Sequence, residues 1–152
     1  MAEVATATAA AASTRQVFDY NHSNDGEYKQ LREQAQRHFK KHKELSLESQ
    51  QSYKNGNKSQ AKQLSDKSHR EYREFQKFNN QAAEFVFVEN NKDSMSNEID
   101  LHGLYVSEAQ YVVKKRLIYG NNHNEQDVHI IVGKGKHSSG GIAKIKPAVE
   151  EL

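Results

Sequence analysis

Two short stretches in the second half of the chain carry residue types that can move protons or bind anions. The first holds Asp100 and His102, in residues 98–102, where polar and apolar residues alternate until Gly103. Such alternation is typical of a strand whose polar side chains share one face. We therefore expect a carboxylate beside an imidazole near a strand end. Histidine titrates near neutral pH and suits a general acid or base.

The second stretch, residues 133–141, reads GKGKHSSGG and directly follows the apolar run at 128–132. Its order fits neither the Walker A motif, whose Lys comes late, nor GxGxxG, whose third Gly is replaced by Ser138. The stretch offers many backbone N–H groups, two lysines, a His and two hydroxyls, and it leads into a helix. Such a loop can bind a phosphate or a sulfate. Both stretches also have a purely structural interpretation. The glycines at 133–141 would simply form a tight turn. In the first stretch, Asp100 would cap the turn that follows it and His102 would be a hydrogen-bonded structural residue.

The absence of cysteine limits the chemistry. A chain with no Cys has no disulfide, no Cys-ligated zinc and no thiol catalysis. There is no HExxH or similar spacing, so only Asp100, His102 and His137 remain as metal ligands. We expect neither a metal nor another cofactor.

The elements that would position both stretches form an α/β unit over residues 98–152. Their order is strand, helix, strand, glycine-rich loop and helix, with Ser107 as the expected N-cap of the first helix. A right-handed crossover would bring the carboxyl ends of the two parallel strands to one edge of the sheet. Open α/β sheets bind ligands at that edge, so we expect Asp100 and His102 to lie beside the loop.

The first half of the chain predicts an antiparallel helical hairpin over residues 26–91. Apolar residues recur at the helical period over residues 28–53 and again over residues 61–86. Between them, the Asn-Gly pair at 55–56 is a helix-ending signal, and Asn57 is a candidate N-cap for the second helix. The apolar residues cover only a narrow strip along each helix, so most of each helix surface would face water.

Charge and hydropathy are unevenly distributed along the chain. The net charge is only +2, but residues 27–78 hold 13 basic and 7 acidic side chains, a local net charge of +6. The mean hydropathy is low, at -0.99, so we expect a disordered tail over residues 1–25 and a polar linker over residues 92–97. No stretch reaches the roughly 18 apolar residues of a membrane span. We expect no membrane partner and a cytoplasmic location, with the nucleus as the alternative.

The two chemical stretches closely resemble the LDLHG and TGxGxHS motifs of the Smr (small MutS-related) domain, in order and in spacing. They are IDLHGL at 99–104 and VGKGKHS at 132–138, and the resemblance covers residues 98–152. The helical half contains YxxLR at 28–32, YKxG at 53–56, AxxLS at 61–65, and AA at 82–83 followed by NN at 90–91. With these residues it resembles the small module of unknown function that often precedes Smr domains in eukaryotes.

The resemblance implies a small α/β sandwich similar to the C-terminal domain of bacterial translation initiation factor 3. It also implies nucleic-acid binding and, as in several members, endonuclease activity on DNA or RNA, including cleavage of mRNA at stalled ribosomes. It assigns Asp100 and His102 as the catalytic pair. The residues that it assigns to substrate binding are Gly133, Lys134, Gly135, Lys136, His137 and Ser138.

The sequence departs from the family pattern at several positions. Active members often carry Arg where this chain has Lys134, and Arg grips phosphate bidentately while Lys does not, so the pattern favours binding more firmly than cleavage. Ile99 stands for Leu in the first motif and Val132 for Thr in the second. Smr domains usually continue into a further strand, so either the chain is truncated at Leu152 or the sheet lacks its last strand.

Three functions remain open, and we favour an RNA endonuclease. In it, His102 would act as base or acid, Asp100 would orient it, and Lys134 with the loop N–H groups would stabilise charge on the phosphate. His137 would be the second proton-transfer group. The alternatives are a module that binds RNA or ribosomes without chemistry through the basic hairpin, and an adaptor whose hairpin binds a protein. RNA is the expected partner, with DNA as the alternative nucleic acid.

Overall fold

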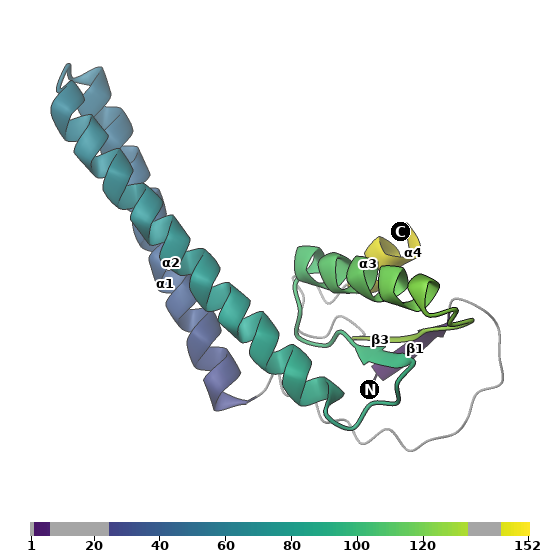
Figure 1. The fold of residues 1–152 in the computed structure, drawn as a ribbon. Helices are drawn as coiled ribbons and strands as arrows, with labels where there is room; N and C mark the ends of the chain where they lie inside the picture. Colours follow the sequence, from purple (N-terminus) through teal and green to yellow (C-terminus); the bar gives the residue numbers. More distant parts are fainter. Residues whose placement is uncertain (1, 7–24, 134–143) are drawn as a thin grey trace. The chain divides into compact units, whose positions relative to one another are not determined.

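The computed structural model describes residues 2–6, 25–133 and 144–152 of the chain, which divide between two compact units. One unit is residues 25–82, and the other joins residues 83–152 to the N-terminal strand. The elements in chain order are β1 (Ala2–Thr6), α1 (Gly26–Lys54), α2 (Lys58–Asn91), β2 (Glu98–Asp100), α3 (Val106–Asn122), β3 (His129–Gly133) and α4 (Ile145–Glu150) (Figure 1).

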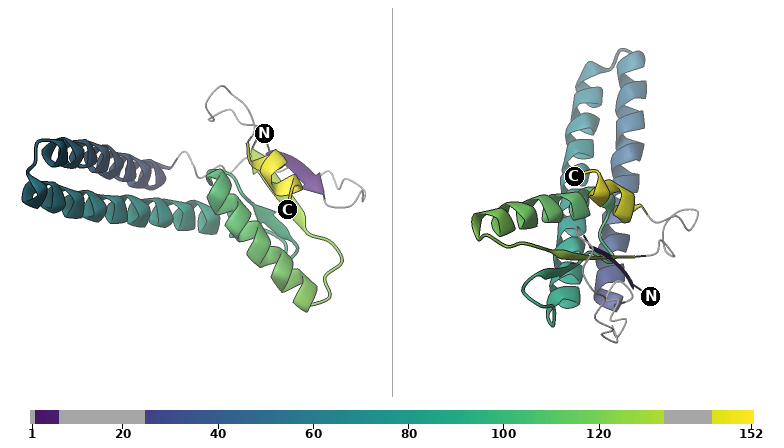
Figure 2. Two further views of the ribbon diagram at one scale, coloured as in Figure 1. Left: turned by 90° about the horizontal axis from the view of Figure 1, so that it is seen from above. Right: turned by 90° about the vertical axis from the view of Figure 1, so that its right-hand side faces the viewer.

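The first unit holds most of the predicted hairpin, in which α1 and α2 run antiparallel, while the last turns of α2 from Ala83 belong to the second unit (Figures 1 and 2). The turn is at Gly56, whose φ of 84° lies in the left-handed region that glycine tolerates. Asn57 Oδ1 accepts the Gln60 backbone N–H at 3.2 Å, and its amide nitrogen donates to Gln60 Oε1 at 2.9 Å. The sequence-based prediction of a turn at 55–56 and a cap at Asn57 is therefore confirmed.

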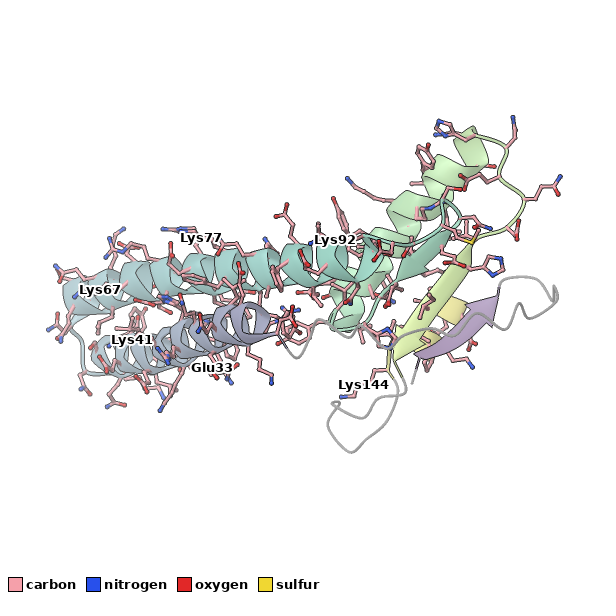
Figure 3. The ribbon with its side chains drawn as sticks, turned by 90° about the horizontal axis from the view of Figure 1, so that it is seen from below. Glu33, Lys41, Lys67, Lys77, Lys92 and Lys144 are labelled. Atoms are coloured by element: carbon pink, nitrogen blue, oxygen red, sulfur yellow. The ribbon has the colours of Figure 1, made fainter. Side chains whose placement is uncertain are left out.

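Polar groups interrupt the apolar seam between the two helices. Ser68 is only 3% exposed, and its hydroxyl lies 2.8 Å from His42 Nδ1 and donates to the His42 carbonyl at 3.0 Å. Phe39 and Phe75 pack beside them with ring centroids 4.8 Å apart. The remaining surface is strongly charged, as the side chains along both helices show (Figure 3). This narrow, partly polar seam agrees with the low hydropathy of the chain.

The second unit contains a three-stranded sheet in the order β1-β3-β2. β2 and β3 are parallel, with Ile99 opposite Ile130, as the strand, helix, strand pattern predicts. Helices α3 and α4 lie on one face of the sheet (Figures 1 and 2). The fully buried side chains of this unit include Leu101, Val113 and Val132. None of the helices in the described part of the chain is long and apolar enough to cross a membrane.

Two expectations about element boundaries need correction. Residues 1–25 were expected to be a disordered tail, but Ala2–Thr6 form β1, which pairs antiparallel with β3. This pairing satisfies backbone groups that would otherwise be left open along the β3 edge; residues 7–24 lie outside the described part. Ser107 is not the N-cap of α3. The cap is Tyr105 and the helix begins at Val106, two residues earlier than a cap at Ser107 would place it; the Tyr105 N–H is accepted by Glu108 Oε2 at 2.8 Å.

Candidate active site

The candidate site lies where the carboxyl ends of β2 and β3 meet. Asp100 ends β2, His102 follows two residues later, and Gly133 ends β3. The Leu101 N–H donates to the Ile131 carbonyl at 2.9 Å, which extends the pairing of the strands past β2. A Cβ atom on Gly133 would lie 3.2 Å from His102 Cδ2. The two strand ends therefore converge, as the sequence predicts.

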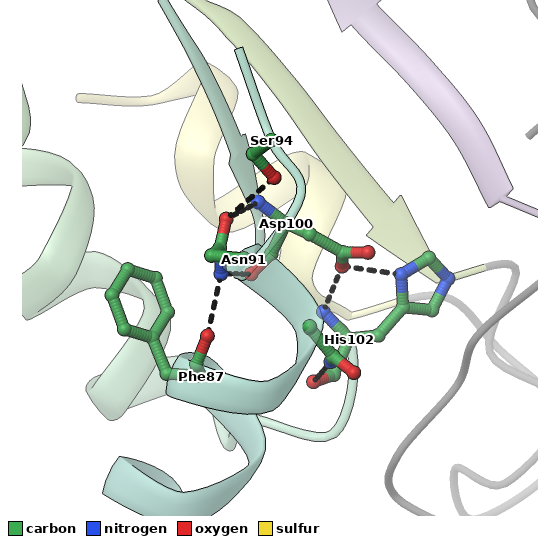
Figure 4. A network of polar contacts seen from close by, with 6 residues as sticks. Phe87, Asn91, Ser94, Asp100 and His102 are labelled. Atoms are coloured by element: carbon green, nitrogen blue, oxygen red, sulfur yellow. Dashed lines mark hydrogen bonds and ion pairs between the residues drawn. The ribbon is translucent and has the colours of Figure 1, made fainter. Parts of the chain in front are cut away.

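Asp100 and His102 form a closely hydrogen-bonded pair. Asp100 Oδ1 lies 2.6 Å from His102 Nδ1 and accepts the His102 backbone N–H at 2.8 Å (Figure 4). The two side chains are only 16% and 10% exposed. An ionised carboxylate can only accept hydrogen bonds, so this contact places a hydrogen on Nδ1. In the neutral ring, Nε2 then carries the lone pair.

The free ring nitrogen of His102 faces outward. Nε2 has no hydrogen-bond partner among the residues that the structure describes. Every buried side-chain nitrogen or oxygen in the described part of the chain has such a partner, so Nε2 must reach the molecular surface. Figure 4 shows it on the side of the ring that faces away from Asp100. A largely buried imidazole thus exposes its proton-accepting atom, which is the arrangement that a general base requires.

Asn91, in the last turn of α2, holds the backbone of Asp100. Its Oδ1 accepts the Asp100 N–H at 2.7 Å, and its Nδ2 donates to the Asp100 carbonyl at 2.9 Å (Figure 4). The same amide also donates to the Phe87 carbonyl at 2.8 Å and accepts from the Ser94 hydroxyl at 3.3 Å. One side chain thus pairs with both backbone polar groups of Asp100, as a neighbouring strand would.

Asn90 extends this support to His102, because its Nδ2 donates to the His102 carbonyl at 2.9 Å. Sequence reasoning missed the positioning role of Asn90 and Asn91. The available signal was two successive amides, each with a donor and an acceptor, at the end of a helix just before a strand.

The structure brings together Asp100, His102 and Gly133 of the expected site residues. The other expected residues lie outside the described part of the chain: Lys134, Gly135, Lys136, His137 and Ser138. Among the described residues, no group of three or more His, Asp or Glu side chains could hold a metal ion. The described chemistry is therefore that of one histidine oriented by one carboxylate.

Comparison with protein families and known proteins gives two successive matches. Residues 28–91 match a domain of unknown function (DUF1771), and residues 99–152 match the Smr domain. Endonuclease NBR9 of Saccharomyces cerevisiae is 53% identical over 136 residues, which are 90% of this chain and 57% of that protein. The Smr domain-containing protein C11H11.03c of Schizosaccharomyces pombe is 35% identical over 83% of this chain and 61% of that protein.

More distant relatives share the same region. NEDD4-binding protein 2 of Homo sapiens is 32% identical over 78% of this chain but only 7% of its own length. The chain thus spans about three fifths or less of these curated relatives. No solved structure matches.

Proposed function

The chain belongs to the Smr-domain proteins that carry a DUF1771 module before the Smr domain, and on that premise we propose that it is an endonuclease that cleaves RNA. The observation that carries the proposal is the outward-facing Nε2 of His102, whose ring is fixed by the 2.6 Å contact with Asp100. The similarity to a yeast protein named as an endonuclease supports the same class of activity.

In the proposed reaction, the ribose 2′-hydroxyl of the substrate is the nucleophile. His102 Nε2 removes its proton, the 2′-oxygen attacks the adjacent phosphorus, and the bond from phosphorus to the 5′-oxygen breaks. The leaving 5′-oxygen takes a proton from a second group, for which His137 is the candidate. Asp100 holds the ring in one tautomer, and Lys134 with the loop N–H groups stabilises the charge on the phosphorane. The products are a 2′,3′-cyclic phosphate and a 5′-hydroxyl.

A cleavage assay on end-labelled oligonucleotides tests this mechanism. Wild type should cleave single-stranded RNA with and without EDTA and should leave a 2′,3′-cyclic phosphate. A matching strand with one 2′-deoxy nucleotide at the cleaved position should resist cleavage there, because the nucleophile is missing. His102→Ala should abolish product formation. Cleavage of DNA, or cleavage that needs a divalent metal, would refute this mechanism.

A binding module without chemistry is the second candidate, and the local charge of +6 over residues 27–78 favours it. Electrostatic binding of RNA should weaken steeply as salt rises, because bound lysines and arginines displace counterions from the phosphates. Salt-sensitive RNA binding by wild type, with no product under any condition of the cleavage assay, would support this candidate over the endonuclease.

A further inference from the structure

A hollow of about 480 Å³ lies beside the turn that joins α1 to α2. Three of the side chains around it, at 49, 61 and 65, are small and leave space between the helices. Its volume falls within the range of roughly 300 to 1,000 Å³ that is usual for ligand sites. The residues that line it are Ser49, Gln50, Tyr53, Lys54, Lys58, Ala61, Lys62 and Ser65.

The hollow is a local concentration of unopposed positive charge. Residues 49–65 contain three lysines and no acidic residue, and all three lysines line the hollow. In the described part of the chain, none of these ammonium groups forms an ion pair. Lys77, farther along the same hairpin, instead lies 3.6 Å from Glu74. Like charges gathered without a counter-charge attract an anion from solution.

Tyr53 adds an aromatic surface to this cationic hollow. The residue is 62% exposed, although it belongs to the lining. The Tyr53 side chain has no ring contact and no hydrogen bond among the described residues. An open aromatic ring beside several lysines is the combination that single-stranded nucleic acids use, because the bases stack on the ring while the phosphates meet the ammonium groups.

We infer that this hollow, formed by Tyr53, Lys54, Lys58 and Lys62 at the hairpin turn, binds a single-stranded RNA segment. The lysines bind successive backbone phosphates, and Tyr53 stacks on a base. The choice of RNA rests on the proposed function, whereas the need for phosphates and a base follows from the hollow itself. A second binding site on the same chain would raise the effective concentration of the strand for the Smr domain.

The test measures how the chain of residues 1–152 binds a fluorescent 2′-O-methyl oligonucleotide, which lacks the reactive 2′-hydroxyl and therefore separates binding from cleavage. One variant carries Lys54→Gln, Lys58→Gln and Lys62→Gln. The matched control carries three substitutions together: Lys29→Gln, Lys40→Gln and Lys67→Gln. It removes the same charge from exposed positions elsewhere on the hairpin.

The variant at the turn should lose affinity by roughly tenfold or more. Its slope of log K against log salt should become shallower by about 2, because each of three lost phosphate contacts contributes roughly 0.7 for a single strand. The control should lose far less affinity. Tyr53→Ala should weaken binding by roughly tenfold at an unchanged slope, because it removes stacking and no charge.

Equal losses in the turn variant and the control would overturn the inference, because total charge alone would then explain binding. Wild-type affinity in the turn variant would also overturn it. Cleavage of unmodified RNA by wild type is measured separately. If the turn variant loses binding but wild type never cleaves, the hollow stands and the endonuclease proposal fails. If wild type cleaves and the turn variant binds normally, the endonuclease proposal stands and the proposed RNA site at the turn fails.

Discussion

Replacing Gly133 with alanine tests whether the position of the His102 ring controls cleavage. The substitution adds one Cβ atom at the end of β3, 3.2 Å from His102 Cδ2 and 3.6 Å from Nε2. Carbon atoms in ordinary contact lie about 3.5–4.0 Å apart. The ring must therefore move away by a few tenths of an ångström or the strand end must shift.

The ring cannot move freely, because Asp100 holds it from the other side. Its Nδ1 lies 2.6 Å from Asp100 Oδ1, which also accepts the His102 backbone N–H at 2.8 Å. A shift must lengthen this contact or turn Nε2 away from its working position. Since a misplacement of about 1 Å can cost roughly 100-fold in rate, we expect Gly133→Ala to slow cleavage by roughly tenfold. Overpacking of this kind destabilises a fold by about 1–3 kcal/mol, which leaves most molecules folded.

The assay is single-turnover cleavage of labelled single-stranded RNA at saturating protein, together with binding of the uncleavable 2′-O-methyl strand and thermal melting. Gly120→Ala, in α3, is the matched control. A Cβ there would meet Glu125 Oε2 at 3.1 Å and Arg116 Nη1 at 3.3 Å, so it would crowd the 2.6 Å ion pair between these two side chains and neither Asp100 nor His102. The control should therefore cleave at the wild-type rate.

A wild-type rate in Gly133→Ala, combined with no cleavage in His102→Ala, would refute the reasoning, because the ring would tolerate the displacement. A loss of RNA affinity that accounts for the whole loss of rate would also refute it. That result would mean that Gly133 acts through binding of the strand and not through His102.

Three further substitutions have expected outcomes. Asp100→Asn removes the charge that holds His102, and because a hydrogen bond to a charged group contributes about 1.5–3 kcal/mol, single-turnover cleavage should fall by about 10-fold to 100-fold; an unchanged rate would contradict this role. Asn91→Ala leaves the backbone groups of Asp100 without their amide partner, so urea denaturation should show a free energy of unfolding lower by about 2–4 kcal/mol. Ser68→Ala removes the bonds to His42 in the hairpin seam and should lower that free energy by about 1–2 kcal/mol at an unchanged cleavage rate; a slower rate would show that the hairpin seam affects the site.

The parts of the fold that carry local signals could be predicted from the sequence. The helical period and the Asn-Gly pair locate the hairpin and its turn, because helix boundaries depend on neighbouring residues. The meeting of His102 with Gly133 could also be predicted, because parallel strands joined through a helix must end at the same edge.

The parts that depend on distant pairing could not be predicted. Strand β1 pairs Ala2 with Gly133, at opposite ends of the chain, and five residues of AEVAT contain no local signal for that partner. The contacts of Asn91 are similar, because an amide at a helix end is equally well satisfied by water. Only the folded chain brings the backbone of Asp100 within 2.7 Å of it.

The contacts of Asn91 also change where the Smr part of the chain begins in structural terms. The match to the Smr domain starts at residue 99, after the expected linker at 92–97. The compact unit, however, starts at Ala83 and includes the last turns of α2, where Val86 is completely buried. Because Asn91 supplies the partners of the Asp100 backbone, the end of the DUF1771 match is part of the scaffold that positions the candidate pair, Asp100 and His102. The order of the two modules thus has a physical basis: the helix that closes the first module supplies the side chain that holds the backbone of the candidate site in the second.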